Sequence, residues 1–258
     1  MSDKKQDGCY KEERVFAPPL LHEVYDLLFS VYGPQGWWPL VSKAGRDGFD
    51  CNGYHPGIVY VPDFYEAFEI AAGAVLVQNT AWSNASIAVK ALYDASLLSP
   101  VRLADTDTES LFPIVRSSGY FRQKSIRLKA LASFFAGLSS PPTRAELMDI
   151  KGIGKETADS ILLYGFDKPF FVVDAYTRRI FYRLGYLSDE KASYDFVASV
   201  FTEVLDKDTE LYREYHALIV EHAKRYCRKK PCCHGCPLAN RCAYYKDRTS
   251  ESSAADRL

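Results

Sequence analysis

Apolar residues recur along most of the chain at the three- and four-residue spacing of amphipathic helices. Between Leu20 and Val31 they occupy positions 20, 21, 24, 27, 28 and 31, which share one helix face. Residues Phe64–Gln78 are apolar on nearly every side, which predicts a helix buried in the centre of the fold. The same spacing predicts further helices over Trp82–Ser96, Thr108–Ser118, Arg122–Gly137, Tyr194–Leu205 and Leu211–Tyr226.

Glycine and proline separate these helices. The segment Gly33-Pro34-Gln35-Gly36-Trp37-Trp38-Pro39 is incompatible with a helix interior, and the loop that it starts continues to about Pro62. A loop of this length is typical of a functional segment. The stretch Phe170–Val173 has the composition of a strand, but it is short and isolated. We therefore predict an all-α fold.

Two short helices joined by a glycine turn are predicted around residue 150. The pattern Thr143-x-x-Glu146 is a capping box, which predicts a helix that ends near Asp149. The tight turn Ile150–Gly154 follows, and a second helix runs from about Lys155 to Tyr164.

This turn is a candidate phosphate-binding site. Glycines let the backbone approach a phosphate closely, and a helix N-terminus favours the negative charge. Two lysines flank the turn as counter-charges, although a glycine turn between helices is also an ordinary connection. The predicted DNA contacts here are Lys151, Gly152, Ile153, Gly154 and Lys155.

Length and composition fit a soluble globular protein. The 258 residues are 47% hydrophobic and 25% charged, which excludes disordered, collagen-like and coiled-coil classes. No apolar run approaches the roughly 20 residues of a membrane span, and residues 1–7 lack the apolar core of a secretory signal. We expect a cytoplasmic protein with no membrane partner.

The net charge of −1 conceals two basic clusters. Such patches on a neutral protein fit a face that contacts phosphates, although solvated helix faces carry similar charge. Lys124 of the first cluster is a candidate DNA contact. The first cluster, which contains no acid, is Arg116, Arg122, Lys124, Arg127 and Lys129, and the second is Lys224, Arg225, Arg228, Lys229 and Lys230.

The C-terminal cysteines predict a metal centre. Four of them, Cys227, Cys233, Cys236 and Cys242, are separated by five, two and five residues, and Cys232 adjoins the second. In a reducing compartment such crowding points to thiolate ligands rather than disulfides. The compact loop with a single CxxC favours a 4Fe–4S cluster over zinc, whose two CxxC pairs are usually further apart. Cys232 is an alternative ligand to Cys233.

Asp174 is a candidate catalytic residue. It begins a helix directly after the apolar pair Val172-Val173, so an N-cap role accounts for it locally. It also follows the glycine turn by about twenty residues. One helix between the two then places its carboxylate near a nucleotide that the turn holds.

These three features, in this order, resemble the endonuclease III type of helix-hairpin-helix DNA glycosylase. That family has a hairpin of the form LPGVGRKTA, an aspartate in a V-D-x-x-x-R context, and a four-cysteine loop around a 4Fe–4S cluster. Its first cysteine spacing is usually one residue longer than here. The resemblance covers Phe64 to Cys242 and implies that Asp174 is catalytic. It also implies that Gln78, within Gly73–Thr80, enters the duplex near the extruded base.

One departure bears on the reaction. Bifunctional members of the family place a lysine directly before Thr-Ala in the hairpin, where it forms a Schiff base with the sugar. This chain has Glu156 there, and Lys155 is one residue earlier, which rotates it away on a helix. The resemblance therefore implies a monofunctional glycosylase, in which Asp174 assists departure of the base and water takes C1′.

The base specificity follows from a closer resemblance to the 3-methyladenine glycosylases of the endonuclease III type. Those enzymes build the base pocket from a Trp-Trp-Pro segment and an aromatic residue after Gln-Asn-Thr, which correspond here to Trp37, Trp38, Pro39 and Trp82. Electron-rich rings attract a cationic alkylated purine. Two adjacent tryptophans that only cap the core are the alternative. These members also lack the iron–sulfur loop and place a pocket lysine near the position of Leu218.

The resemblance also implies a domain organisation and a partner. We expect a disordered segment at 1–15, a helical domain from 16–61 plus 169–226, a six-helix domain at 62–168 with the hairpin, the cluster loop 227–242 and a tail at 243–258. The expected partner is double-stranded DNA with a damaged base, bound by a monomer at the nucleoid of a prokaryotic cell. Alternative functions are excision of oxidised pyrimidines or mismatched bases, and damaged-DNA binding without catalysis.

Overall fold

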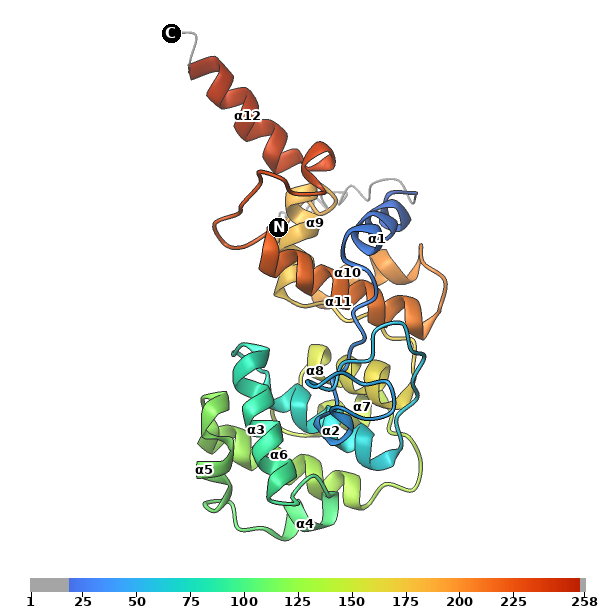
Figure 1. The fold of residues 1–258 in the computed structure, drawn as a ribbon, viewed down its shortest axis with the longest axis vertical. Coiled ribbons are helices and arrows are strands. Elements are labelled where there is room, and N and C mark those ends of the chain that lie inside the picture. Colours follow the sequence, from blue (N-terminus) through green and yellow to red (C-terminus); the bar gives the residue numbers. More distant parts are fainter. Residues whose placement is uncertain (1–18, 256–258) are drawn as a thin grey trace, which may run out of the picture.

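The computed structural model describes residues 19–255, with side chains from Leu20 to Thr249, and its regular elements there are all helices (Figure 1). The predicted disordered segment 1–15 lies outside the described residues. Within them, no helix combines the length and the apolar character that a membrane span requires. The long helices are α1 (Pro19–Tyr32), α2 (Phe64–Leu76), α3 (Trp82–Asp94), α6 (Phe121–Ala136), α9 (Ala175–Leu184), α10 (Tyr194–Thr202), α11 (Thr209–Arg225) and α12 (Ala243–Ala255).

Shorter helical segments fill the space between them. They are α4 (Pro100–Asp105), α5 (Leu111–Val115), α7 (Arg144–Asp149), α8 (Lys155–Ser160) and the turns η1 (Val41–Lys43), η2 (Arg116–Ser118), η3 (Ile161–Gly165) and η4 (Ala239–Arg241). The stretch Phe170–Val173 is extended without a strand partner, which confirms the all-α prediction.

The structure differs from the predicted elements in three places. Pro100 starts α4, a helix that the sequence analysis did not predict, because its missing N–H and fixed φ suit the first helical position. The helix predicted over Thr108–Ser118 is the shorter α5 followed by the turn η2. The predicted tail 243–258 contains α12 through Ala255.

Helix α2 forms the centre of the core, as its apolar composition predicts. Asp63 caps it by accepting hydrogen bonds from the N–H groups of Tyr65 (2.8 Å) and Glu66 (2.9 Å), and Glu66 completes the capping box. Every residue from Glu66 to Leu76 is buried. The helix packs against α3, α6, α8 and η3, so it supports the second helical segment of the hairpin, α8 and η3.

The helices form two lobes: α2 to α8 lie in the lower half of Figure 1, and α1 and α9 to α12 lie in the upper half. The hairpin lobe (residues 64–165) contains α2 to α8 and η3, and the second lobe (residues 19–32 and 175–255) contains α1 and α9 to α12. Helix α11 contacts η3 across the waist. The domain boundaries at 61/62 and 168/169 stay a prediction.

Arg213 of α11 ties the two lobes together. Its guanidinium donates to the carbonyl oxygen of Leu163 (2.9 and 3.1 Å), to that of Tyr60 (3.1 Å) and to the carboxylate of Asp167 (2.8 Å). Because Arg213 is nearly buried, these charge-assisted bonds fix α11 against the end of the hairpin's second helix.

Candidate active site

The hairpin has the predicted form, and its turn requires glycine. Thr143 and Glu146 make both bonds of the capping box at the start of α7. Gly152 has φ +94°, and a Cβ atom there would lie 2.3 Å from Nε of Arg127. Position 152 therefore accepts only glycine without displacing the arginine. The turn leads into α8 and then η3, so the second helical segment continues to Gly165.

Two ion pairs hold the hairpin in place. Arg144 of α7 makes a two-pronged bond to the buried carboxylate of Asp159 in α8 (2.6 and 2.9 Å). Lys155, at the start of α8, pairs with Asp195 of α10, which also lies 3.5 Å from Arg144. The Lys155 ammonium is thus engaged by an acid of the second lobe.

The residues predicted to bind DNA at the turn have different exposures. Lys151 and Gly154 are exposed, whereas the side chain of Ile153 is buried and contributes only its backbone to the surface. Gln78 lies against the turn. Its side-chain amide donates to the carbonyl oxygen of Gly152 (3.1 Å) and to the hydroxyl of Thr157 (2.9 Å). Its role at the duplex stays a prediction.

Asp174 is the N-cap of α9, and its carboxylate also faces the imidazole of His216. Its Oδ1 accepts hydrogen bonds from the N–H (2.7 Å) and the hydroxyl (2.9 Å) of Thr177. Its Oδ2 lies 3.7 Å from Nε2 of His216 on α11. Burial by itself raises the pKa of Asp174, but His216 and Thr177 outweigh burial and hold this pKa below its ordinary value. The carboxylate is therefore ionised at neutral pH.

His216 is held from its other side by Tyr164 of η3. The Tyr164 hydroxyl lies 2.8 Å from Nδ1 of His216 and 3.2 Å from the carbonyl oxygen of Arg213. Tyr164 and His216 are buried and the Asp174 side chain is 12% exposed, so the chain Tyr164–His216–Asp174 runs from the core to the surface between the lobes. Nothing in the local sequence around position 216 indicates this contact.

Glu156, at the start of α8, faces the same region. Its side chain reaches solvent, yet the surrounding protein raises its pKa, and the charge of Asp174 raises it further. His216 and Arg178 act in the opposite direction. The two carboxylates are thus close enough to repel each other, and their pKa values move apart.

The predicted base-pocket residues form an aromatic cluster beside this region. The ring centroids of Trp38 lie 5.6 Å from Trp37, 5.2 Å from Trp82 and 5.3 Å from Tyr164. Trp38 and Pro39 are buried, so they support the cluster and do not present an open face for stacking. Trp37 and Trp82 are half-buried.

Lys124 is not a DNA contact, which corrects the prediction. Its side chain is 1% exposed and donates to the carbonyl oxygens of Leu76 (2.8 Å) and Ser118 (2.6 Å). Burial, with a smaller contribution from Arg127, lowers the pKa of Lys124 to about 8. The lysine caps the end of α2 instead of facing solvent.

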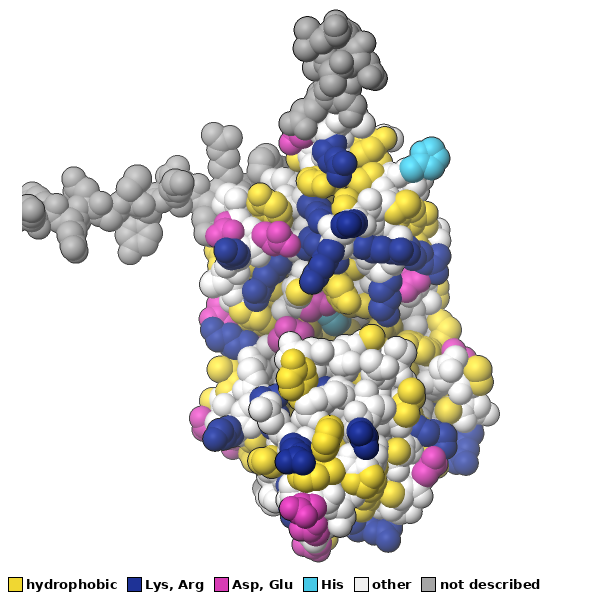
Figure 2. Space-filling model, turned by 90° about the vertical axis from the view of Figure 1, so that its left-hand side faces the viewer, with side chains coloured by type: hydrophobic (Ala, Val, Ile, Leu, Met, Phe, Trp, Pro, Cys, Tyr) yellow, Lys and Arg dark blue, Asp and Glu magenta, His cyan; other side chains and the backbone are white. Residues whose placement is uncertain are grey.

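The other basic residues are either bonded to neighbouring groups of the protein or exposed to solvent. In the first cluster Arg127 donates to Oε1 of Gln78 (2.6 Å) and Lys129 to the carbonyl oxygen of Thr106 (2.6 Å), whereas Arg116 and Arg122 are exposed. All five members of the second cluster are exposed. Figure 2 shows Lys and Arg side chains gathered on the upper half of one face, above a hollow between the lobes.

The cysteine loop folds over the end of α9. Cys227, Cys233, Cys236 and Cys242 are half-buried and line one small cavity, and Cys232 also reaches it but is exposed. Arg183 of α9 donates to Sγ of Cys227 (3.3 Å). Among the described residues, no three His, Cys, Asp or Glu side chains are arranged to hold a metal ion as they stand. The predicted 4Fe–4S cluster thus stays a prediction.

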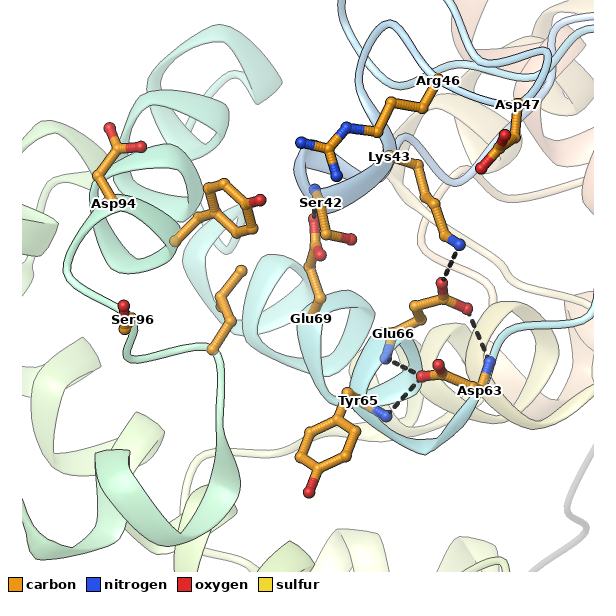
Figure 3. Close-up of a pocket in the computed structure, with 12 residues that line it drawn as sticks. Ser42, Lys43, Arg46, Asp47, Asp63, Tyr65, Glu66, Glu69, Asp94 and Ser96 are labelled. Atoms are coloured by element: carbon orange, nitrogen blue, oxygen red, sulfur yellow. Dashed lines mark hydrogen bonds and ion pairs between the residues drawn. The ribbon is translucent and has the colours of Figure 1, made fainter.

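A wider pocket of about 720 Å³ lies apart from these residues (Figure 3). It is formed by the loop 42–47, the start of α2 and the loop after α3. Two of its carboxylates, on Glu66 and Glu69, already have partners. Glu66 pairs with Lys43 (3.1 Å), and Glu69 accepts from the N–H of Val41 (2.5 Å). Among the described residues, the predicted site residues do not line it.

Comparison with known proteins places this geometry among DNA repair proteins. The model of the family described as HhH-GPD superfamily base excision DNA repair protein matches residues 72–206. The "Putative DNA repair glycosylase MJ1434" of Methanocaldococcus jannaschii is 39% identical over 235 residues, which cover 86% of this chain and 96% of the relative.

Two solved structures are similar to the whole fold. A trapped covalent intermediate of endonuclease III with DNA has a TM-score of 0.70 at 20% identity and covers 91% of this chain and 100% of its own. The 3-methyladenine DNA glycosylase of H. pylori, bound to 1,N6-ethenoadenine, has a TM-score of 0.58 at 25% identity and covers 79% of this chain and 97% of its own.

Proposed function

Because the chain belongs to the HhH-GPD superfamily of base excision DNA repair proteins, we propose that it is a monofunctional DNA glycosylase for alkylated purines. It hydrolyses the N-glycosidic bond of a 3-methyladenine-like base after the nucleotide has rotated out of the duplex. The observation that carries the proposal is Asp174, an ionised and nearly buried carboxylate whose Oδ1 is held by Thr177 and whose Oδ2 faces His216 at 3.7 Å.

The reaction uses Asp174 as a fixed negative charge. The bond between C1′ and the base nitrogen breaks, and its electron pair leaves with the base. The positive charge that develops on the sugar is stabilised by the carboxylate, which needs no reorganisation because Thr177 already holds it. Water then adds to C1′ and loses a proton, and an abasic site remains in an uncut strand. A cationic alkylated purine leaves as a neutral molecule, so no strong general acid is required.

The residues at the start of α8 support hydrolysis rather than strand cleavage. Glu156 occupies the position of the Schiff-base lysine in bifunctional relatives and has no nucleophilic amine. Lys155 has one, but Asp195 engages its ammonium. An ammonium in an ion pair holds its proton and is a poor nucleophile.

The aromatic cluster supports the choice of base. Trp37 and Trp82 are half-buried, electron-rich rings, and the buried Trp38 packs against both. Lys224, 5.5 Å from the centroid of the Trp37 ring, shows that this ring accepts a cation. A cation over a tryptophan face gains about 0.5–2 kcal/mol, which favours a charged alkylated base over neutral adenine. The structural likeness to an enzyme solved with an ethenoadenine base points in the same direction.

Binding of duplex DNA is assigned to the exposed part of the hairpin turn and to the second basic cluster. The N–H groups of the turn and Lys151 meet the phosphates, and Gln78 is the side chain beside the turn that reaches toward the duplex. This binding is electrostatic, so affinity falls steeply with salt.

The four half-buried cysteines fit a 4Fe–4S cluster. Cys227, Cys233, Cys236 and Cys242 line a common cavity, and Cys233 is preferred to Cys232 because Cys232 is exposed. When bound, the cluster would join these four cysteines through iron–thiolate bonds and would hold the loop closed on itself. A brown protein with about four irons per chain and visible absorbance lost on oxidation supports the cluster, whereas zinc without iron contradicts it.

The test of the function is to incubate the purified protein with methylated duplex DNA and to identify the released bases by mass. We expect 3-methyladenine among the products, with strand breaks only after alkali treatment. If no methylated base is released, the alkylation specificity is wrong, and oxidised or mismatched duplexes are assayed in its place. DNA binding without release of any base contradicts the enzyme itself.

A further inference from the structure

His216 is a buried polar side chain that the proposed reaction does not yet use. It is 6% exposed, and its Nε2 is shielded from solvent without a hydrogen-bond partner in the described residues. The atom that it faces is Oδ2 of Asp174 at 3.7 Å. A buried polar atom without a hydrogen-bond partner is destabilising, so this arrangement needs a physical reason.

The proton on His216 provides that reason. If Nε2 carries no proton, its lone pair faces an ionised carboxylate, and the two repel. If Nε2 is protonated, it points a positive N–H toward Oδ2, and Nδ1 accepts a hydrogen bond from the Tyr164 hydroxyl at 2.8 Å. The second tautomer gives Nδ1 its donor and turns the Nε2–H group toward Oδ2 of Asp174, which lies 3.7 Å away.

We propose that His216 is the positioning residue of Asp174, and that Tyr164 selects its Nε2–H tautomer. Asp174 is then held on both oxygens, by Thr177 at Oδ1 and by His216 at Oδ2. The neutral imidazole fixes the carboxylate without cancelling its charge, so the full negative charge faces the sugar. This inference rests on the proposed function, because it assigns a role within the same reaction.

The kinetic test compares His216→Leu and His216→Gln with the full-length wild-type protein in single-turnover base release. Loss of the clamp lets the carboxylate move, and misplacement of a catalytic group by about 1 Å costs on the order of 100-fold. We expect that loss in His216→Leu at unchanged DNA affinity, and partial recovery in His216→Gln, whose amide N–H can donate. A wild-type rate in His216→Leu overturns the proposal.

A second measurement does not depend on activity. In protein labelled with ¹⁵N-histidine, the imidazole nitrogen signals distinguish the two tautomers at neutral pH. We expect His216 to carry its proton on Nε2, and Tyr164→Phe, which removes the donor to Nδ1, to weaken that preference. A proton found on Nδ1 alone overturns the proposal. If the wild-type protein releases no base from any substrate, the proposed function fails, and the tautomer still decides the role of His216.

Discussion

The region between the lobes has two sides, here called the buried wall (Asp174 and His216) and the exposed wall (Lys151 and Glu156), and their side chains differ in burial. On the side of the second lobe, Asp174 and His216 are nearly buried and fixed by hydrogen bonds. On the side of the hairpin lobe, Lys151 and Glu156 are exposed to solvent. Buried, fixed charges act strongly and resist salt, whereas exposed charges act weakly and are screened. The difference suggests that the second lobe supplies the chemistry and the hairpin supplies the affinity for DNA.

The largest expected effect comes from the buried wall. Asp174→Asn keeps the shape of the side chain but removes its charge, so single-turnover base release is expected to fall about 1000-fold. DNA affinity is expected to stay within a few-fold. Because the pKa of Asp174 lies below its ordinary value, protonation of this carboxylate does not slow the wild-type enzyme between pH 5 and 8. Equal losses of rate and affinity in the variant would contradict the division between the walls.

Lys124 provides a contrast within a basic cluster, because it is a buried cation that cannot reach DNA. Lys124→Met leaves the carbonyl oxygens of Leu76 and Ser118 without their donor, which costs about 1–3 kcal/mol in the free energy of unfolding. Urea denaturation measures this loss. The salt dependence of DNA binding is expected to match that of the wild type, and a shallower dependence would restore Lys124 as a phosphate contact.

Glu156 tests the exposed wall near the chemistry. Glu156→Gln removes a negative charge that repels both Asp174 and the DNA phosphates, so DNA affinity is expected to rise a few-fold. Base release is expected to change less than about 10-fold. Since burial and Asp174 raise the pKa of Glu156, this group gains its proton before an ordinary glutamate as the pH falls. If Glu156→Gln lowers the rate of base release as much as Asp174→Asn does across the pH range, Glu156 is the catalytic acid instead.

Lys151 is expected to show the smallest effect. Lys151→Ala removes one exposed phosphate contact, which reduces the slope of log affinity against log salt by about 1 and weakens binding a few-fold. At saturating enzyme the rate of base release stays unchanged. Fluorescence anisotropy at several salt concentrations measures the slope, and an unchanged slope places the DNA elsewhere.

Local rules predicted the hairpin and the helix caps correctly. The capping box at Thr143 and Glu146, the glycine turn and the N-cap at Asp174 each depend on residues within a few positions of one another. The family resemblance is confirmed by the matched family model. Helix α4, which begins at Pro100, was not predicted because its six residues are too few to show a helical period.

The sequence analysis missed the burial of Lys124 and Trp38 and the contact between His216 and Asp174. Lys124 precedes Leu128 by four residues and Leu131 by seven, which places it on the buried face of α6, and this spacing was a usable signal. His216 gave none, because its partner Asp174 belongs to another helix and only the packing of α11 brings them together. The burial of Trp38 likewise depends on Gly73 of α2, where a Cβ atom would lie 3.1 Å from Nε1 of the indole.

The central claim is that base removal proceeds by water addition at Asp174 and not by an amine of the hairpin. The most direct test is to add borohydride during the reaction of the wild-type protein with methylated duplex DNA, and to count released bases and covalent protein–DNA adducts in the same sample. Base release without an adduct is the predicted result. An adduct that accompanies release and disappears in Lys155→Gln would contradict the account and identify Lys155 as a nucleophile.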